Sequence, residues 1–233
     1  MKKQIPNIIT LMNLSCGVVG IVCAFNMRID LALYLMLGAS LFDFLDGAAA
    51  RLLGAYSDLG KELDSLCDMV SFGVLPSVMM YKISTEIFMG QHWSCYAPLL
   101  ISIFSAYRLA KFNIDSRQSD SFLGLPTPAC AILIGAISYY LYTNPLCTLL
   151  SPLSICITIA VLCILLVCEL PMFSIKFHKT DPSSLRIKRL AMLVIVLLSI
   201  IACLVFKLNW SVALIFTFLA YILKNLLYAI LKI

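Results

Sequence analysis

Four aspartates at helical spacing, Asp43, Asp46, Asp64 and Asp68, lie within 26 residues of a largely apolar stretch. Asp43 and Asp46 are three positions apart, and Asp64 and Asp68 are four apart, so on helices each pair occupies a single face. Two antiparallel neighbouring helices would direct all four carboxylates toward one place. Such a group of anions is repulsive unless cations lie among them, and Arg51 alone cannot balance four charges.

Carboxylate oxygens favour a hard divalent ion, Mg²⁺, Mn²⁺ or Ca²⁺, over zinc or copper. Four carboxylates suffice for two ions with shared ligands, the arrangement that stabilises the entering and leaving oxygens in phosphoryl displacement. Gly47 lets a phosphate or nucleotide approach the backbone, and Arg51 suits a two-pronged phosphate contact. Two alternatives stay open from these residues alone, an ion or proton pathway through a membrane and a set of buried structural ion pairs.

Membrane helices are the elements that must position these residues. The 233 residues are 62% apolar and 12% charged, with a mean hydropathy of +1.00. A soluble domain is about 45–50% apolar and about 25% charged, so the composition excludes that class, and it excludes a disordered chain as well. One spanning helix takes about 20 residues. We therefore expect an all-α, polytopic integral membrane helical bundle of about eight transmembrane helices, a single membrane domain over residues 1–233.

Hydropathy and helix breakers predict spans at 8–27, 31–53, 58–82, 94–112, 124–143, 149–170, 189–207 and 210–231. Lys and Arg are enriched in cytoplasmic loops. With the N-terminus inside, 14 of the 17 Lys and Arg fall on that side. This distribution predicts a multi-pass protein of the cell membrane whose N-terminus and aspartate cluster face the cytoplasm. We expect membrane lipids and no nucleic acid among its partners.

A longer pattern surrounds the aspartates. Residues 43–68 read D-F-L-D-G-A-A-A-R, eight further residues, and then G-K-E-L-D-S-L-C-D. This resembles the signature of the CDP-alcohol phosphatidyltransferases, D-x2-D-G-x2-A-R-x8-G-x3-D-x3-D, and every fixed position is present. The resemblance implies an integral membrane enzyme that moves a phosphatidyl group from a CDP-activated lipid to an alcohol and releases CMP.

The resemblance also implies roles for individual residues. The four aspartates would hold two divalent cations, Mg²⁺ or Mn²⁺, and Asp68 would also act as the general base. The CDP moiety of CDP-diacylglycerol would contact three residues of the signature region, Gly47, Arg51 and Ser57. The segment P-N-I-I-T at 6–10 resembles the part of the family that closes over the nucleotide, which adds Asn7 and Thr10. Both residues are equally suited to begin a helix. A homodimer is a further implication.

Three other stretches point to the acceptor alcohol: S-F-G-V-L-P at 71–76, Y-R-L-A-K-F-N at 107–113 and G-L-P-T-P-A at 124–129. Together they resemble the membrane-integral phosphatidylserine synthases (CDP-diacylglycerol–serine O-phosphatidyltransferases), which implies L-serine as acceptor and phosphatidylserine as product. The resemblance covers residues 5–135, the expected catalytic core, while 136–233 would add C-terminal transmembrane helices.

Arg108 and Lys111 are candidates for binding serine, because they share a predicted helix end on the side of Arg51. Positive-inside placement accounts for both charges equally well. Lys111 stands where the family usually has arginine, so it keeps the charge and loses the fork geometry.

Two other functions remain open at this stage. A sibling transferase would share the metal site and use glycerol 3-phosphate, inositol phosphate or choline as acceptor. A cation transporter would use the four aspartates as its ion site. Transport needs no arginine for phosphate, so Gly47, Arg51 and Gly60 at fixed spacing favour the transferase.

Overall fold

The computed structural model describes residues 4–115, 122–144, 151–172 and 209–231, together with 196–199, 201, 203 and 205. Its main helices are α1 (Gln4–Phe25), α2 (Ile29–Leu53), α3 (Asp58–Asp68), α4 (Leu75–Ile87), α5 (Leu100–Ile114), α6 (Thr127–Thr143), α7 (Pro152–Val167) and α9 (Trp210–Leu231). A π-helical segment, η1 (Met69–Val74), joins α3 to α4, and a 3-10 segment, η2 (Trp93–Leu99), leads into α5. Two short strands, β1 (Phe122–Leu123) and β2 (Pro171–Met172), form one antiparallel pair.

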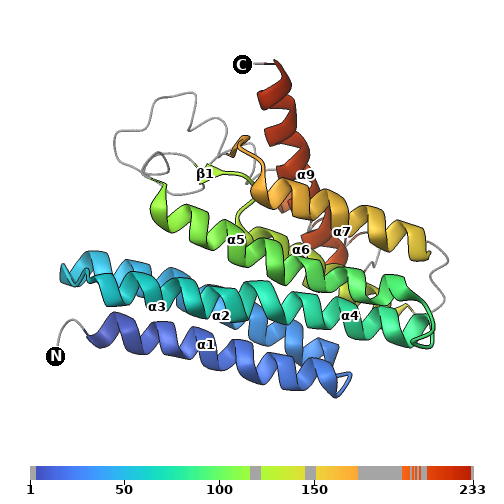
Figure 1. Cartoon of the computed structure of the whole chain (residues 1–233), viewed down its shortest axis with the longest axis horizontal. Helices are drawn as coiled ribbons and strands as arrows, with labels where there is room; N and C mark the ends of the chain where they lie inside the picture. Colours follow the sequence, from blue (N-terminus) through green and yellow to red (C-terminus); the bar gives the residue numbers. More distant parts are fainter. Residues whose placement is uncertain are drawn as a thin grey trace.

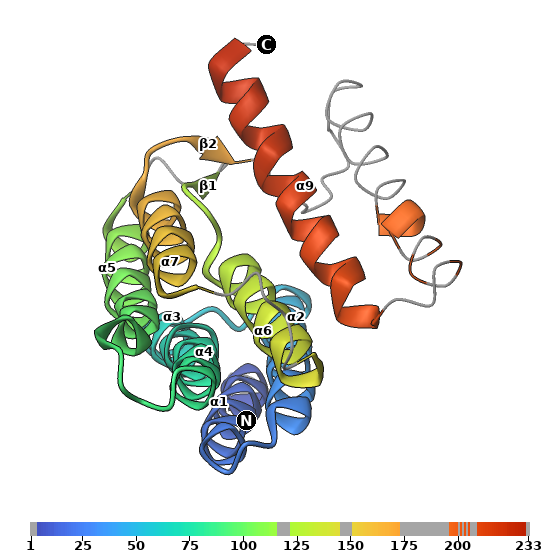
Figure 2. The same cartoon turned by 90° about the vertical axis from the view of Figure 1, so that its right-hand side faces the viewer.

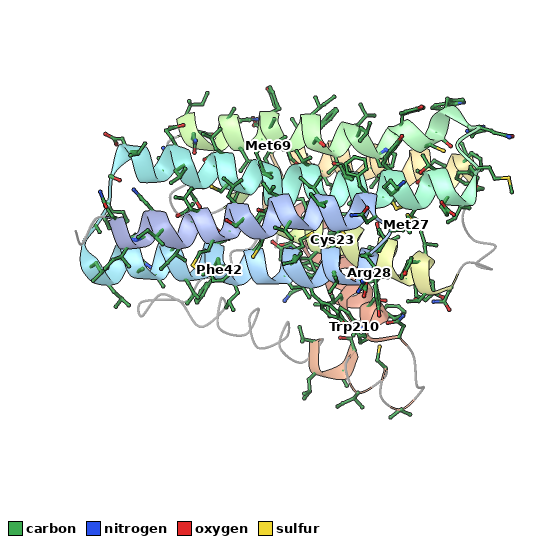
Figure 3. All side chains as sticks on the ribbon, turned by 90° about the horizontal axis from the view of Figure 1, so that it is seen from below. Cys23, Met27, Arg28, Phe42, Met69 and Trp210 are labelled. Atoms are coloured by element: carbon green, nitrogen blue, oxygen red, sulfur yellow. The ribbon has the colours of Figure 1, made fainter. Side chains whose placement is uncertain are left out.

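Four long elements, namely α1, α2, the α3–η1–α4 segment and α5, lie side by side along the length of the molecule, and successive ones alternate in direction (Figure 1). The elements α3, η1 and α4 form one continuous rod that runs parallel to α1, and Met69 lies near the middle of this rod (Figure 3). Seen end-on, α1 to α7 form a bundle and α9 packs beside α6 (Figure 2). The Trp210 ring holds α9 there, since its centroid lies 5.7 Å from that of Tyr34 in α2 and 5.3 Å from that of Tyr139 in α6.

Small residues let α1 approach the rod closely. A Cβ on Gly17 would overlap the Ser71 hydroxyl and lie 3.0 Å from Ser71 Cα, and one on Gly20 would lie 2.8 Å from Leu75 Cδ2. The Ser71 hydroxyl donates a hydrogen bond to the main-chain carbonyl of Asn13 at 3.1 Å. Close approach through small residues is common in membrane bundles. These contacts fix the register of α1 on α3, the helix that carries two of the four aspartates.

The membrane character expected from composition is confirmed. By length and composition, α1, α2, the rod Asp58–Ile87 and the Trp210–Leu227 part of α9 can each cross a membrane, while α6 and α7 are shorter apolar helices. Large apolar side chains are exposed on the outside of the bundle, including Val22, Phe44 and Ile164. An extensive apolar surface of this kind is unfavourable in water and fits a lipid environment. The expected all-α membrane bundle is therefore what the chain forms.

The helix bounds refine the expected spans. The span expected at 58–82 is the α3–η1–α4 rod and continues to Ile87, and the span expected at 94–112 begins as the 3-10 segment. The span expected from residue 124 begins at Thr127 instead, because Gly124 has a positive φ of 75° and Pro126 has extended backbone. The span expected at 189–207 lies largely outside the described residues.

Main-chain hydrogen bonds join the segment before α6 to the end of α7. The Gly124 N–H donates to the Leu170 carbonyl at 2.9 Å, and the Leu125 N–H donates to the Leu165 carbonyl at 2.8 Å. A Cβ on Gly124 would lie within 2.8 Å of two carbonyl oxygens, so this crossing needs glycine. The β1–β2 pair continues the same contact.

Candidate active site

Three of the four aspartates form one acidic cluster. Each carboxylate of Asp43, Asp64 and Asp68 has an oxygen within 4.8 Å of an oxygen of the other two. Asp43 comes from α2 and the other two come from α3, the next helix in the chain. The two acidic faces therefore meet across one pair of helices, as the i,i+3 and i,i+4 spacings predict.

A short turn sets these helices against each other. Gly54 ends α2 in the left-handed conformation with φ of 58°, where glycine avoids the strain of a side chain. Ser57 is the N-cap of α3, and its hydroxyl accepts a hydrogen bond from the Gly60 N–H at 3.0 Å. A Cβ on Gly60 would lie 3.0 Å from Ser57 Oγ and 3.2 Å from Asn7 Oδ1. The absence of a side chain at Gly60 thus lets α1 and the turn meet.

Asp46 stands apart from the acidic cluster. It is buried, one turn further along α2, and its Oδ2 atom has no hydrogen-bond partner among the described residues. It lines a cavity of about 210 Å³, as does Asp64. The expectation that four carboxylates converge on one point therefore holds for three of them, with Asp46 in the adjoining cavity. Its position follows from the helix, which turns Asp46 toward the start of α1, where Thr10 also lines the cavity.

The cavity contains most of the residues expected to contact the CDP moiety. It lies between the start of α1, the end of α2 and the start of α3, and four expected residues line it, namely Asn7, Thr10, Gly47 and Ser57. The fifth, Arg51, is not part of the lining, but its Nη1 lies 3.6 Å from the place that a Gly47 Cβ would take. Other lining residues were not expected there: Pro6, Ala50, Ala55, Tyr56 and Lys61.

A second polar layer is buried next to the acidic cluster. The side-chain amide of Asn13 in α1 donates a hydrogen bond from Nδ2 to Asp68 Oδ1 at 3.2 Å. Arg108 of α5 is 7% exposed and donates from Nη1 to Thr127 Oγ1 at 2.6 Å. It lies between two contacts of α5 with the rod, Asn113 with Ser65 and Ser105 with Gly73, and so at the level of Asp68. Arg108, expected as a serine ligand, is thus on the inside of the bundle close to Asp68 rather than on its rim. Its guanidinium carbon also lies 5.9 Å from the centre of the Phe112 ring.

The other expected serine ligand, Lys111, is one turn further out on α5. Its Nζ forms an ion pair with Glu169 Oε1 at 2.8 Å, with both side chains partly exposed. Nearby, the Lys61 ammonium donates to the Asn113 carbonyl at 2.9 Å, and the Asn113 amide donates to Ser65 Oγ at 2.9 Å. These bonds hold the end of α5 to α3 and so fix Arg108 relative to Asp68.

Asn13 and Thr127 are the polar partners that sequence reasoning did not single out. Asn13 is fully buried in the middle of α1, and the residue it bonds is 55 positions away in the sequence. The one sequence signal that could have identified Asn13 is its polar amide within an apolar span, because such a group needs a partner inside the bundle. Thr127 belongs to the 124–129 stretch that resembles phosphatidylserine synthases, and its contact with Arg108 depends on the packing of α5 on α6.

With this geometry established, the chain can be compared with known proteins. The sequence profile of the CDP-alcohol phosphatidyltransferase family matches residues 3–168, which include α1 to α7 and every aspartate described above. The chain belongs to this family. The residues of the acidic cluster and of the cavity all lie within the range that the family profile matches.

Several curated proteins resemble this CDP-alcohol phosphatidyltransferase over somewhat more than half of its length. A CDP-diacylglycerol–serine O-phosphatidyltransferase of Bacillus subtilis is 37% identical over 139 residues, 59% of this chain and 76% of that protein. One of Helicobacter pylori strain J99 is 39% identical over 131 residues, 55% of this chain and 54% of that protein. An archaetidylserine synthase of Methanothermobacter thermautotrophicus is 34% identical over 139 residues, 59% of this chain and 58% of that protein. The match thus spans about half the length of the last two.

The residues present fit a hard divalent cation. Asp43, Asp64 and Asp68 supply only oxygen ligands within 4.8 Å of one another, which is the donor set that Mg²⁺ and Mn²⁺ accept. The orphaned Oδ2 of Asp46 is a second indication, since a buried carboxylate oxygen is costly unless a donor or cation meets it. The structure thus supports one acidic cluster suited to a metal and one further carboxylate beside it.

Proposed function

We propose that this CDP-alcohol phosphatidyltransferase transfers the phosphatidyl group of CDP-diacylglycerol to L-serine, forming phosphatidylserine and releasing CMP. The observation that carries the proposal is the acidic cluster of α2 and α3 beside a cavity lined by residues expected to contact CDP. The serine acceptor is supported by the names of the Bacillus and Helicobacter relatives and by the buried Arg108 close to Asp68.

The donor would bind with its CDP moiety in the cavity. The open backbone at Gly47 leaves room for a diphosphate, and Arg51, which folds back over Gly47, is placed for a two-pronged contact with it. Asn7, Thr10 and Ser57 surround the remaining space for the nucleotide. The acyl chains would extend into the lipid around the bundle.

The four aspartates would hold two divalent cations, Mg²⁺ or Mn²⁺. Asp43, Asp64 and Asp68 would hold one ion, and Asp46 would supply a carboxylate toward the cavity for the second, together with shared ligands. When bound, such ions stabilise the negative charge that develops on the diphosphate. The removal of metal should therefore abolish turnover.

The chain's own residues would perform the proton transfer. The serine hydroxyl oxygen forms a bond to the lipid-linked phosphorus, and Asp68 accepts the hydroxyl proton. The bond between this phosphorus and the oxygen of CMP breaks, and its electron pair leaves with CMP. The hydrogen bond from Asn13 holds the Asp68 carboxylate in place, and Arg108 would bind the serine carboxylate. Lys111 would add a positive charge at the rim.

CMP release by the purified full chain tests this function. The reaction would contain CDP-diacylglycerol with Mg²⁺ or Mn²⁺, and L-serine would be present or absent. We expect serine-dependent release that EDTA abolishes. Release only with glycerol 3-phosphate, inositol phosphate or choline would replace serine as the acceptor and keep the reaction class. Metal-dependent cation flux in liposomes without any CMP release would instead indicate a transporter. An ether-linked donor in parallel tests the lipid that the archaetidylserine relative suggests.

The general base has its own test. The substitution Asp68→Asn should lower turnover by about 10²–10⁴-fold, which is the contribution of general-base catalysis, while CDP-diacylglycerol still binds. The matched control is Asp30→Asn in the first turn of the same α2, because Asp30 is paired with Arg28 outside the site. Wild-type turnover in the Asp68 variant would exclude this residue as the base.

Two features of the whole protein complete the proposal. The cavity end of the bundle would face the cytoplasm, because that end carries most of the basic residues. The chain would also act as a homodimer. The mass of the purified protein with its bound detergent subtracted decides between one copy and two.

A further inference from the structure

Three buried polar atoms of α1 and α5, two helices that pack against the α3–η1–α4 rod, have no hydrogen-bond partner within the part of the chain that the structure describes. They are Asn13 Oδ1 in α1, and Ser105 Oγ and Arg108 Nε in α5. Most buried polar side-chain atoms in proteins are paired, so unpaired ones require an explanation. Their three side chains belong to residues that are 0%, 0% and 7% exposed. Three such atoms on the two helices that pack on this part of the rod point to a polar ligand.

The orientation of the Asn13 amide is fixed by its neighbour. A carboxylate only accepts hydrogen bonds, so the group that meets Asp68 Oδ1 at 3.2 Å must be the donating Nδ2. The carbonyl oxygen Oδ1 therefore has to be the end without a partner. It is an acceptor that needs a donor.

The two unpaired atoms of α5 have the opposite character. Arg108 Nε is a donor, and the arginine has no described carboxylate within ion-pair distance. Ser105 is three residues earlier, on the same face of α5, and its Oγ has a hydroxyl proton to donate. This face meets the rod just after Asp68, because a Cβ on Gly73 would lie 3.2 Å from Ser105 Cβ. Donors thus lie on α5 and an acceptor lies on α1, and both helices pack against the rod where Asp68 ends α3.

We propose that Asn13 selects the acceptor of this enzyme by accepting a hydrogen bond from the ammonium group of an amino acid. A zwitterionic amino acid matches these unpaired atoms, since its carboxylate only accepts hydrogen bonds and its ammonium group only donates them. The carboxylate binds Arg108 and Ser105, and the ammonium group binds Asn13 Oδ1. This inference rests on the proposed transfer to serine and deepens it.

The position of Asn13 also separates the acceptor from the donor. Thr10 and Asp64 line the cavity, and Asn13 and Asp68 are one turn further along the same two helices. The CDP moiety occupies the outer level and the amino acid the inner level, where Asp68 reaches its hydroxyl. Inositol phosphate and glycerol 3-phosphate have no N–H group to offer Asn13, and neither does the quaternary ammonium of choline. The amide therefore disfavours these alcohols.

Serine analogues that lack one charged group test this assignment. The purified full chain is assayed for serine-dependent CMP release, with ethanolamine (no carboxylate) and 3-hydroxypropionate (no ammonium) as competitors. Asn13→Ala should weaken the binding of serine and of ethanolamine by about ten- to hundredfold, the range for a hydrogen bond to a charged group. The binding of 3-hydroxypropionate should be unchanged. Arg108→Met should show the reverse pattern: the binding of serine and of 3-hydroxypropionate should weaken, and the binding of ethanolamine should be unchanged.

The controls separate this role from a structural one. Ser138→Ala removes a buried hydroxyl that bonds only its own helix and a methionine sulfur in α4, so it should leave all three affinities unchanged. An Asn13→Ala enzyme that weakens all three compounds equally, or loses kcat with an unchanged KM for serine, would overturn the proposal and make Asn13 a positioning residue for Asp68. If the Asn13 variant needs more metal for activity but binds the three compounds in the wild-type order, Asn13 is a metal ligand instead.

The outcomes also distinguish this inference from the function on which it rests. Wild-type enzyme without serine-dependent release overturns both. Wild-type enzyme with such release, but without the analogue pattern in the Asn13 variant, overturns only the role of Asn13.

Discussion

At the scale of single residues, a substitution at Gly47 tests whether the fold or the substrate requires glycine at this position. A Cβ at Gly47 meets nothing closer than Arg51 Nη1 at 3.6 Å, so the protein itself has room for a methyl group. Gly47→Ala should therefore fold normally and gain about 0.5–1 kcal/mol of helix stability. Its kcat/KM for CDP-diacylglycerol should fall by about 10–100-fold, since the methyl group displaces the diphosphate.

Gly38→Ala is the matched control, because it lies on the same helix and its nearest contact is Cys16 Sγ at 3.9 Å. Steady-state kinetics and thermal unfolding of both variants in one detergent make the comparison. Equal kinetics in the two variants would mean that no ligand approaches the backbone at Gly47.

Lys111 poses a different question at the same scale, because an ion pair to Glu169 already accounts for its charge. Partly exposed pairs contribute about 0–1 kcal/mol, so neither Lys111→Ala nor Glu169→Ala should lower stability much. If Lys111 attracts the serine carboxylate, Lys111→Ala raises the KM for serine by about two- to fivefold, while Glu169→Ala leaves it unchanged or lowers it. Equal changes in KM would show that the lysine only pairs with Glu169.

At the scale of elements, the packing of α1 on the rod decides whether Asn13 reaches Asp68. Gly17→Ala puts a methyl group against the Ser71 hydroxyl and its Cα, and the backbone cannot move aside. Overpacking of this kind costs about 1–3 kcal/mol, and it should also lower kcat because it shifts Asn13. Gly135→Ala is the control, since the atom it meets is the flexible end of Met36. Thermal unfolding and kcat together test this, and a Gly17→Ala enzyme with wild-type kcat would show that the register of α1 is unimportant for catalysis.

The elements also show what the sequence could and could not predict. Long apolar runs, the Gly54 turn and the spacing of the aspartates predict the helices and the facing of α2 on α3, because these are local or periodic signals. The π-helical segment after Asp68 has no such signal, since the hydrogen-bond shift within it depends on packing against α1 and α5. The separate position of Asp46 and the contact of Asn13 with Asp68 depend on how distant segments meet. Sequence spacing alone does not contain that information.

At the scale of the whole molecule, the direction of the bundle in the membrane follows from where its charges lie. Arg51, Lys61 and Lys111 belong to the end that contains the cavity, whereas Arg28 joins α1 to α2 at the opposite end (Figure 3). The positive-inside rule then predicts that the cavity faces the cytoplasm, where serine is available. Alkaline phosphatase fused after Gly90, in the loop between α4 and η2, should be active, because this enzyme folds only outside the cytoplasm. The same reporter fused after Asp115, just beyond α5, should be inactive, and a green fluorescent protein in its place should fluoresce. The reversed pattern would place the cavity outside and contradict the proposed supply of serine, even with the acidic cluster and the fold intact.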